Sequence, residues 1–204
     1  DTLYMTLVST AIAYLIGIPL GVILVITRRD GICPAPKTNA VLGTIVNIMR
    51  SVPFLILIIV LIPFTRLVAG TSIGATATIV PLIVGAAPFI ARMVESSLLE
   101  VDAGVVEAAQ AMGASPWQIV TKVLLKESVP SLVTGAAIAL TTILGYSAMA
   151  GAVGGGGLGD LAIKYGYHRY QTDVLLLTLI ILVLLVQVIQ ALGNAVAERI
   201  DHRK

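Results

Sequence analysis

The feature that most constrains this chain of 204 residues is a series of long apolar runs without a charged side chain. A membrane-spanning helix needs about 20 mostly apolar residues, because each residue advances the helix by about 1.5 Å and the hydrocarbon layer is about 30 Å thick. Four runs exceed that length: residues 2–27, 67–91, 128–159 and 174–197. Only 12% of the residues are charged, against about a quarter in soluble domains. The sequence therefore predicts an all-α membrane protein with one domain over residues 1–204.

A fifth apolar run is interrupted by a charge. Residues 51–65 are too short to span alone, at roughly 22 Å of helix, but the uncharged residues 38–49 precede them and only Arg50 intervenes. We interpret the two as one span over about 41–64, with Arg50 near its cytoplasmic end and reaching toward the headgroups. Alternatively, Ser51 and Pro53 begin a new helix after an interfacial elbow. The five predicted spans cover residues 3–27, 41–64, 70–92, 129–150 and 174–197.

The basic residues predict the orientation, because cytoplasmic loops are enriched in Lys and Arg. With the amino terminus outside, ten of the 13 basic residues are cytoplasmic: Arg28, Arg29, Lys37, Arg50, Arg92, Lys122, Lys126, Arg199, Arg203 and Lys204. Three are external: Arg66, Lys164 and Arg169. Five spans then place the carboxyl terminus in the cytoplasm; the family resemblance given below implies a bacterial plasma membrane. We expect no cleavable signal peptide, and the opening at Asp1 without a methionine leads us to expect that a short leader was trimmed.

The longest polar interruption, the cytoplasmic loop 93–127, predicts two consecutive helices. Residues 107–112 are good helix formers and Gly113 is a typical terminator. Ser115 can then cap a second helix with Pro116 at its first position, running to about residue 126. Small side chains at 108 and 109 would let the surface of another protein approach the short helix closely, and a glutamate at 107 supplies charge where that helix begins.

Glu107-Ala108-Ala109, three residues and then Gly113 resemble the Glu-Ala-Ala loop of binding-protein-dependent ABC importer permeases. In that family the loop forms a coupling helix seated in a cleft of the ATPase subunit. The resemblance thus assigns ATPase coupling to residues Glu107, Ala108, Ala109, Gln110, Ala111, Met112 and Gly113. Val123 fits the aliphatic position that follows in the family pattern, whereas Lys126 stands where the family has proline, and we expect Pro130 to take over at the exit of the second helix.

Four further stretches, residues 50–54, 88–92, 145–149 and 154–159, are similar to the methionine-uptake branch of these permeases. That branch has five spans per subunit, works as a homodimer and imports methionine. The resemblance implies as partners a second copy of the chain, two cytoplasmic ATP-binding subunits and an extracytoplasmic substrate-binding protein or lipoprotein. The chain has no phosphate-cradling Gly-x-x-x-x-Gly-Lys-Ser/Thr motif. We therefore expect no ATPase site and no cofactor here, with ATP and Mg bound by the partner ATPase.

The fourth predicted span is unusually polar and small-sided, with Tyr146, Ser147 and Met149 near its end. Small residues allow close helix packing, which is one interpretation. The other is that this helix lines the pathway near the axis of a dimer, where Met149, flexible and polarizable, closes the pore against its symmetry mate.

Two glycine motifs have different interpretations. Gly154-x-Gly156-x-x-Gly159 matches the dinucleotide fingerprint formally, but that motif needs a preceding strand, so we interpret it as a flexible external turn near the mouth of the pathway. Gly17 and Gly21 are typical of close helix packing.

Several polar residues are interpreted structurally. Gln187, Gln190 and Asn194 share one face of the fifth span and are predicted to hydrogen-bond neighbouring helices, or else to line the pore. Arg92 and Glu95 are predicted to pair. The isolated histidines and single cysteine favour neither a metal site nor a disulfide: His168, His202 and Cys33. The net charge of +2 gives no reason to expect nucleic-acid binding.

The resemblance therefore predicts a permease subunit that translocates an amino acid, most specifically methionine, by alternating access driven by separate ATPase subunits. Import of another small polar solute is an alternative. An ion-coupled secondary transporter is another, although such proteins place ionisable residues at mid-membrane depth and the four clear spans have none. A structural subunit of a membrane complex is the third.

Overall fold

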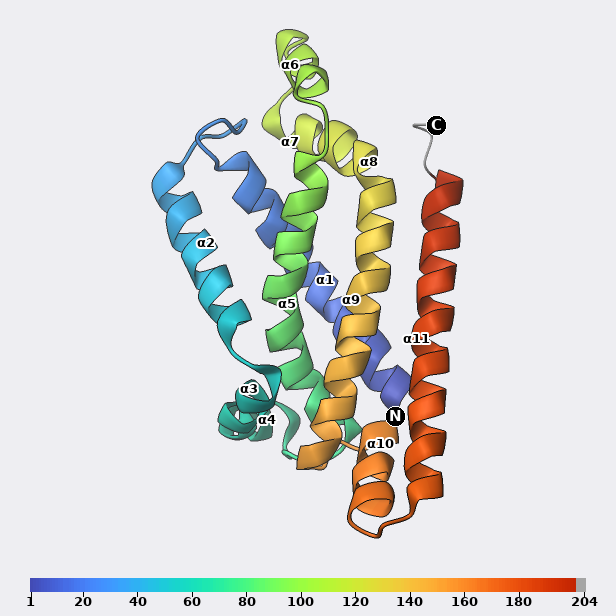
Figure 1. The fold of residues 1–204 in the computed structure, drawn as a ribbon. Coiled ribbons are helices and arrows are strands. Elements are labelled where there is room, and N and C mark those ends of the chain that lie inside the picture. Colours follow the sequence, from blue (N-terminus) through green and yellow to red (C-terminus); the bar gives the residue numbers. More distant parts are fainter. Residues whose placement is uncertain (201–204) are drawn as a thin grey trace.

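The computed structural model describes residues 1–200, and all regular structure in that part of the chain is helical (Figure 1). His202, Arg203 and Lys204, named above, lie outside the described residues. In the described part of the chain, five long helices form an elongated bundle: α1 (Thr2–Ile26), α2 (Pro36–Ser51), α5 (Ala75–Leu99), α9 (Val129–Ala150) and α11 (Thr172–Ile200).

Short helices cover the two ends of the bundle (Figure 1). One end, called here the α6 end, carries α6 (Ala103–Ala111), α7 (Pro116–Ile119), the π-helical turn η1 (Val120–Leu124) and α8 (Leu125–Glu127). The other, called the α10 end, carries α3 (Phe54–Val60), α4 (Ile62–Ala69), the 3-10 turn η2 (Gly151–Val153), α10 (Gly157–Leu161) and the π-helical η3 (Ala162–Tyr167). The long helices alternate in direction, so α1 begins toward the α10 end and α11 finishes at the α6 end.

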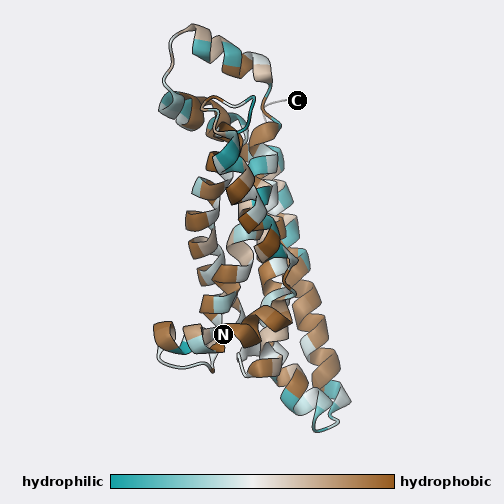
Figure 2. Ribbon diagram, turned by 90° about the vertical axis from the view of Figure 1, so that its left-hand side faces the viewer, coloured by the Kyte–Doolittle hydropathy of each residue, from teal (hydrophilic) through white to brown (hydrophobic). Residues whose placement is uncertain are grey.

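Apolar residues run along the length of the bundle, and hydrophilic residues lie at its ends and also along part of one side (Figure 2). Within residues 1–200, four helices are long and apolar enough to cross a membrane: Thr2–Ile26, Ala75–Leu99, Val129–Val153 and Thr172–Ile200. A fifth crossing exists if the bent pair α2 and α3 counts as one span. The all-helical class and the four long apolar helices are thus confirmed.

The pair α2 and α3 bends by 98° between Ser51 and Phe54. Pro53 causes the break, because proline has no N–H to donate and restricts the residue before it to extended backbone. Val52 accordingly has φ −78° and ψ 122°. Residues 41–64 are therefore not one straight helix, and the chain follows the alternative in which a new helix begins after the proline. Helices α2 and α3 can still count together as one span.

The bend also changes the position of Arg50. Helix α2 starts at the α6 end with Pro36 (Figure 1). Arg50 lies 14 residues further along, which is about 21 Å of helix at 1.5 Å per residue. Grouping Arg50 with the basic residues at the start of α2, such as Arg28 and Lys37, was wrong.

Helices α1 and α5 pack closely at the two glycines of α1. A Cβ atom on Gly21 would lie 2.7 Å from the Ala91 carbonyl oxygen and from Val94, and one on Gly17 would collide with Ile90. The close packing predicted for this motif is confirmed. Much of the buried core gathers around the same interface and includes Met5, Leu82, Ile90, Val94 and Ile143.

Two polar side chains tie α2 to its neighbours. Asn39 Nδ2 donates to the Leu24 carbonyl at 2.6 Å and to Thr27 Oγ1 at 3.0 Å, which joins α2 to α1. Arg92 of α5 donates to Glu95 Oε2 at 2.6 Å and to the Gly43 carbonyl of α2 at 2.9 Å. The predicted Arg92–Glu95 pair is confirmed, and it also fastens α5 to α2.

The glycine-rich segment 154–159 is tightly packed, so a flexible turn was the wrong interpretation. The Leu158 N–H donates to Thr2 Oγ1 at 2.8 Å, and a Cβ on Gly159 would collide with the Ala148 carbonyl. Gly154 and Gly156 have φ of 81° and 80°, a region that favours glycine. The segment follows a helix rather than the strand that a dinucleotide fingerprint requires.

Helix α11 is mostly uncovered in the single chain, with 6% of its apolar window buried. Gln187, Gln190 and Asn194 are exposed and make no hydrogen bond within residues 1–200. The prediction that they bond to neighbouring helices therefore fails within one copy of the chain.

Candidate functional site

Helix α6 is a short, capped helix at the tip of the bundle (Figure 1). Asp102 is its N-cap, and the carboxylate accepts a hydrogen bond from the Gly104 N–H at 2.7 Å. The chain leaves the helix after Met112 through Gly113, whose φ is 80°. Gly113 thus terminates the helix as the sequence predicted.

A second helix returns the chain to the bundle. Ser115 and Gln118 form a capping box, with the Ser115 N–H donating to Gln118 Oε1 at 2.8 Å and the Gln118 N–H to Ser115 Oγ at 3.4 Å. Pro116 occupies the first turn, and the helical chain continues through η1 and α8 to Glu127. Pro130 lies in the first turn of α9. The helix, turn and second helix predicted for this loop are all present. The first helix begins at Ala103 rather than at Glu107, because Asp102 caps it, so placing Glu107 at the helix start was wrong.

The two faces of α6 differ in exposure. Ala109 is 5% exposed and belongs to the core cluster that contains Ile119 and Leu124 of the returning helix. Val106 is half-buried and packs against that cluster. The other predicted coupling residues are all exposed: Glu107, Ala108, Gln110, Ala111, Met112 and Gly113. Another protein can therefore approach α6 closely at Ala108, whereas Ala109 packs α6 against the rest of its own chain.

Large apolar side chains are exposed around the same tip. Met112 is 82% exposed, Trp117 75% and Val105 45%. Val105 and Met112 lie on α6 and at its C-cap, whereas Trp117 lines an apolar cavity beside Ile23 of α1. Exposed apolar groups mark interaction surfaces, and tryptophan is frequent among them. Sequence reasoning missed Trp117, although it is the only tryptophan in the chain and directly follows the capping proline.

A charged cavity of about 310 Å³ lies beside α6. Its lining includes Arg28, Asp30, Glu107 and Gln110. Arg28 Nε lies 3.3 Å from Asp30 Oδ1, and a backbone hydrogen bond together with this guanidinium holds the pKa of the Asp30 carboxyl below its usual range. Glu107 makes no ion pair within the described chain and is available to a basic partner group.

The candidate pathway residues of α9 do not share one environment. Met149 is 50% exposed and lies on an uncovered face with Thr134, Ile138 and Gly145. Ser147 is buried, and its Oγ donates to the Leu144 carbonyl at 2.8 Å, so it does not reach that face.

Tyr146 is half-buried, and its ring stacks on Phe54 with centroids 4.5 Å apart and planes 5° from parallel. This contact attaches the start of α3 to α9. Among the three candidates, Met149 alone is on the open face of α9, and Tyr146 borders it.

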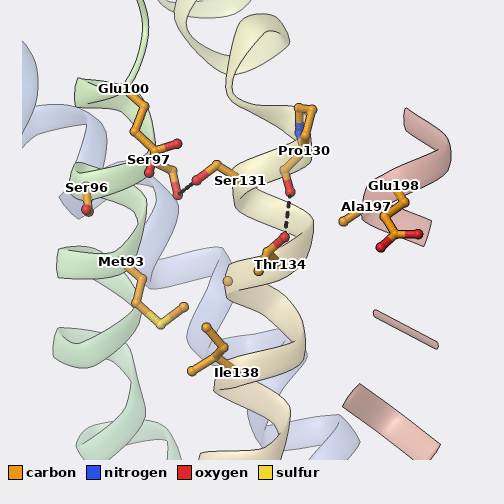
Figure 3. A pocket seen from close by; sticks show the side chains of 11 residues that line it. Met93, Ser96, Ser97, Glu100, Pro130, Ser131, Thr134, Ile138, Ala197 and Glu198 are labelled. Atoms are coloured by element: carbon orange, nitrogen blue, oxygen red, sulfur yellow. Dashed lines mark hydrogen bonds between the residues drawn. The ribbon is translucent and has the colours of Figure 1, made fainter. Parts of the chain in front are cut away.

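The largest cavity described here, about 560 Å³, lies toward the α6 end between α5, α9 and the last turns of α11 (Figure 3). Hydroxyl groups predominate among its polar groups, and Ser131 Oγ donates to Ser97 Oγ at 3.0 Å. Its lining residues are Met93, Ser96, Ser97, Glu100, Pro130, Ser131, Thr134, Gly135, Ile138, Ala197 and Glu198. Because Thr134 and Ile138 also belong to the uncovered face of α9, cavity and face form one continuous surface that runs toward Met149. Within residues 1–200 no three His, Cys, Asp or Glu side chains lie close enough together to hold a metal ion.

The sequence of residues 17–204 matches the model of a family described as "Binding-protein-dependent transport system inner membrane component". The chain belongs to this family. As a family member it is an inner membrane component, which agrees with its long apolar helices.

This inner membrane component has similar relatives with curated descriptions. It is 54% identical over 203 residues to the "Probable D-methionine transport system permease protein MetI" of Vibrio cholerae, covering 100% of this chain and 90% of the relative. It is 56% identical over 151 residues to the "D-methionine transport system permease protein MetI" of Escherichia coli K12, covering 74% of this chain and 70% of the relative.

Its structure is similar to that of a chain in "Inward facing conformations of the MetNI methionine ABC transporter", with a TM-score of 0.97, 52% identity and coverage of 98% of this chain and 93% of that one. A chain of an "amino acid ABC transporter with histidines" has a TM-score of 0.78 at 19% identity, which shows a shared fold.

Proposed function

We propose that this inner membrane component is the permease subunit of an ATP-driven methionine importer, and that α6 couples it to a separate ATPase. The single observation that carries the coupling is the exposed, firmly mounted α6 at one tip of a helical bundle. The substrate is supported by the relatives, which are described as D-methionine permeases.

In the proposed mechanism an ATPase subunit grips α6 and moves it as a rigid piece. Ala109 and the returning helix fix α6 to the core, so a force on its outer face passes into α5 and α9. ATP draws two such ATPase subunits together, and the spans repack toward an outward-open state. Hydrolysis then restores the inward-facing state. ATP and Mg are bound by the ATPase partner.

We place the α6 end in the cytoplasm. Arg28, Lys37, Arg92, Lys122 and Arg199 belong to elements that begin or finish at that end, whereas Arg66, Lys164 and Arg169 lie near the α10 end. The positive-inside rule favours this orientation, with the amino terminus outside and the carboxyl terminus inside. The α10 end then faces the substrate-binding protein or lipoprotein.

A second copy of the chain completes the pathway. In one copy of the chain, the face of α9 with Gly145 and Met149 is uncovered. Helix α11 is also largely unburied and leaves a second, apolar surface open. A homodimer that pairs the α9 faces would enclose a route between them, with the cavity of Figure 3 as its cytoplasmic mouth.

ATP-dependent uptake of labelled methionine into proteoliposomes tests the proposed function. The liposomes contain the permease, its ATPase subunits and its binding protein, and we expect accumulation that stops when ATP is replaced by a non-hydrolysable analogue. Accumulation driven instead by an ion gradient without ATP would contradict the proposal, and so would transport of another polar solute in place of methionine.

We expect Met149→Ala to make the pathway leak. Removing the exposed thioether from the uncovered α9 face takes away the group that we propose meets its symmetry mate. The measurement is efflux of preloaded methionine from proteoliposomes without ATP, and efflux should be faster than from the unaltered complex. Met112→Ala makes the same change at the opposite end and should not leak. Equal efflux from both variants would remove Met149 from the gate.

A further inference from the structure

A small cavity surrounds the end of α2 on the side where α2 turns into α3. Its volume is about 140 Å³, which is less than drug-sized ligand pockets need and suits one end of a small solute. The lining contains one charged side chain, Arg50, among apolar and aromatic groups: Met49, Val52, Phe54, Leu57, Gly85, Phe89 and Tyr146.

The cavity lies inside the apolar thickness of the bundle. Gly85 is ten residues from the start of α5, about 15 Å from the α10 end at 1.5 Å per residue. Tyr146 is four residues from the end of α9, about 6 Å by the same measure. Arg50 is therefore well within a layer about 30 Å thick rather than at its surface.

An arginine at that depth needs a negative partner, because a charge in the bilayer interior is costly. Arg50 makes no hydrogen bond or ion pair within residues 1–200, and neither does the Tyr146 hydroxyl. Three carboxylates pair with other cations: Asp30 with Arg28, Glu95 with Arg92 and Asp160 with Lys164. The fold thus holds an uncompensated cation next to a free hydroxyl.

The position of this cation connects it with the pathway. Tyr146 follows Gly145, which lies on the uncovered face of α9, and Arg50 is itself exposed in the single chain. The stacked rings of Phe54 and Tyr146 form one wall of the cavity. Gly85 makes room for Phe54 and Leu57, since a Cβ there would lie 3.3 Å from Phe54 Cδ2 and 3.2 Å from Leu57 Cδ2.

We propose that Arg50 is the transient binding site for the α-carboxylate of the transported amino acid. The guanidinium can hold a carboxylate through two parallel hydrogen bonds, and the Tyr146 hydroxyl can donate a third. The apolar lining then receives an aliphatic or thioether side chain. This inference rests on the proposed function and names the substrate group that the permease recognises: a free carboxylate on a small amino acid with an apolar side chain.

Photo-labelling of the complete transporter tests this site. The probe is a diazirine-bearing aliphatic amino acid, used as the free acid and as its methyl ester, with mass spectrometry to find the labelled residues. In the unaltered complex the free acid should label residues 49–57 and 85–89. Arg50→Gln should reduce that labelling at least about tenfold, the loss expected when a charge-assisted contact is removed. The methyl ester, which lacks the negative charge, should label both complexes equally and weakly.

Matched variants keep the result interpretable. Arg66→Gln removes another exposed arginine, on α4, and should label as the unaltered complex does. Arg50→Lys preserves the charge but loses the forked geometry, so it should be labelled less than the unaltered complex and more than Arg50→Gln. If Arg50→Gln fails to assemble, reduced labelling of Arg50→Lys still tests the site.

Labelling absent from residues 49–57 and 85–89 of the unaltered complex would overturn the inference, and so would equal labelling in the Arg50 variants. ATP-dependent uptake by the unaltered complex separates the two proposals. If uptake is intact while Arg50 proves irrelevant, only the carboxylate site fails, whereas absent uptake in the unaltered complex removes the proposed function as well.

Discussion

Ala108→Trp is expected to uncouple the permease from its ATPase. Ala108 is exposed on the outer face of α6, where a bulky ring would hold a docked surface away from the helix. Disrupting a central contact of an interface costs about 2 kcal/mol or more, which weakens docking roughly 30-fold. Co-purification with the ATPase and ATP-dependent uptake should both fall, while the melting temperature of the membrane subunit should stay unchanged.

The control for this prediction is Ala152→Trp, the same substitution at an exposed alanine of the α10 end. It should leave ATPase co-purification intact. Glu107→Lys reverses the charge beside the cavity that Arg28 lines, and it should weaken docking without lowering stability. Normal ATPase binding in both α6 variants would contradict the coupling role, as would labelling of a cysteine at position 110 from outside the cell.

Gly21→Ala is expected to destabilise the bundle. The new Cβ would lie 2.7 Å from the Ala91 carbonyl and from Val94, both in the interior of α5. Backbone atoms of α5 cannot move aside as the tip of a flexible side chain can, so α1 and α5 must separate. Overpacking of this kind costs about 1–3 kcal/mol. Thermal unfolding of the detergent-solubilised protein measures the loss.

Gly145→Ala is the matched control, because it is also a helix-interior glycine but has nothing within 4 Å of the added Cβ. Alanine is favoured over glycine in helices by up to about 1 kcal/mol, so this variant should be as stable as the original or more so. If both variants melt alike, the α1–α5 contact does not limit the stability of the bundle.

The sequence predicted the elements that depend on local chemistry. Apolar length alone predicted four long helices, and Gly113, Ser115 and Pro116 predicted the turn between α6 and the returning helix. These features are determined within a few residues of the chain, by solvation and by capping, so no tertiary information was needed.

Other features depend on contacts between distant residues, and there the sequence misled. An elbow at Ser51 and Pro53 was only the alternative to one span over 41–64, and the 98° bend found there changes the depth of Arg50. Ala109 differs from Ala108 only in its direction on α6, so its burial against the returning helix had no local signal. The glycines at 154–159 suggest flexibility when the segment is considered alone. They are tightly packed because Thr2, far away in sequence, and Ala148 at the end of α9 lie against them.

The polar contacts around α2 limit which parts of the bundle can slide. Asn39 holds α2 to α1, Arg92 holds it to α5, and the glycines of α1 lock α1 to α5. We expect α1, α2 and α5 to move together as one block. Sliding one of them past another would break a partly buried hydrogen bond or disturb the close packing at the glycines. Helix α11 has no such brace and meets α9 where Gly193 lies against Ala137. Motion during transport should therefore rotate the α1–α2–α5 block as one unit.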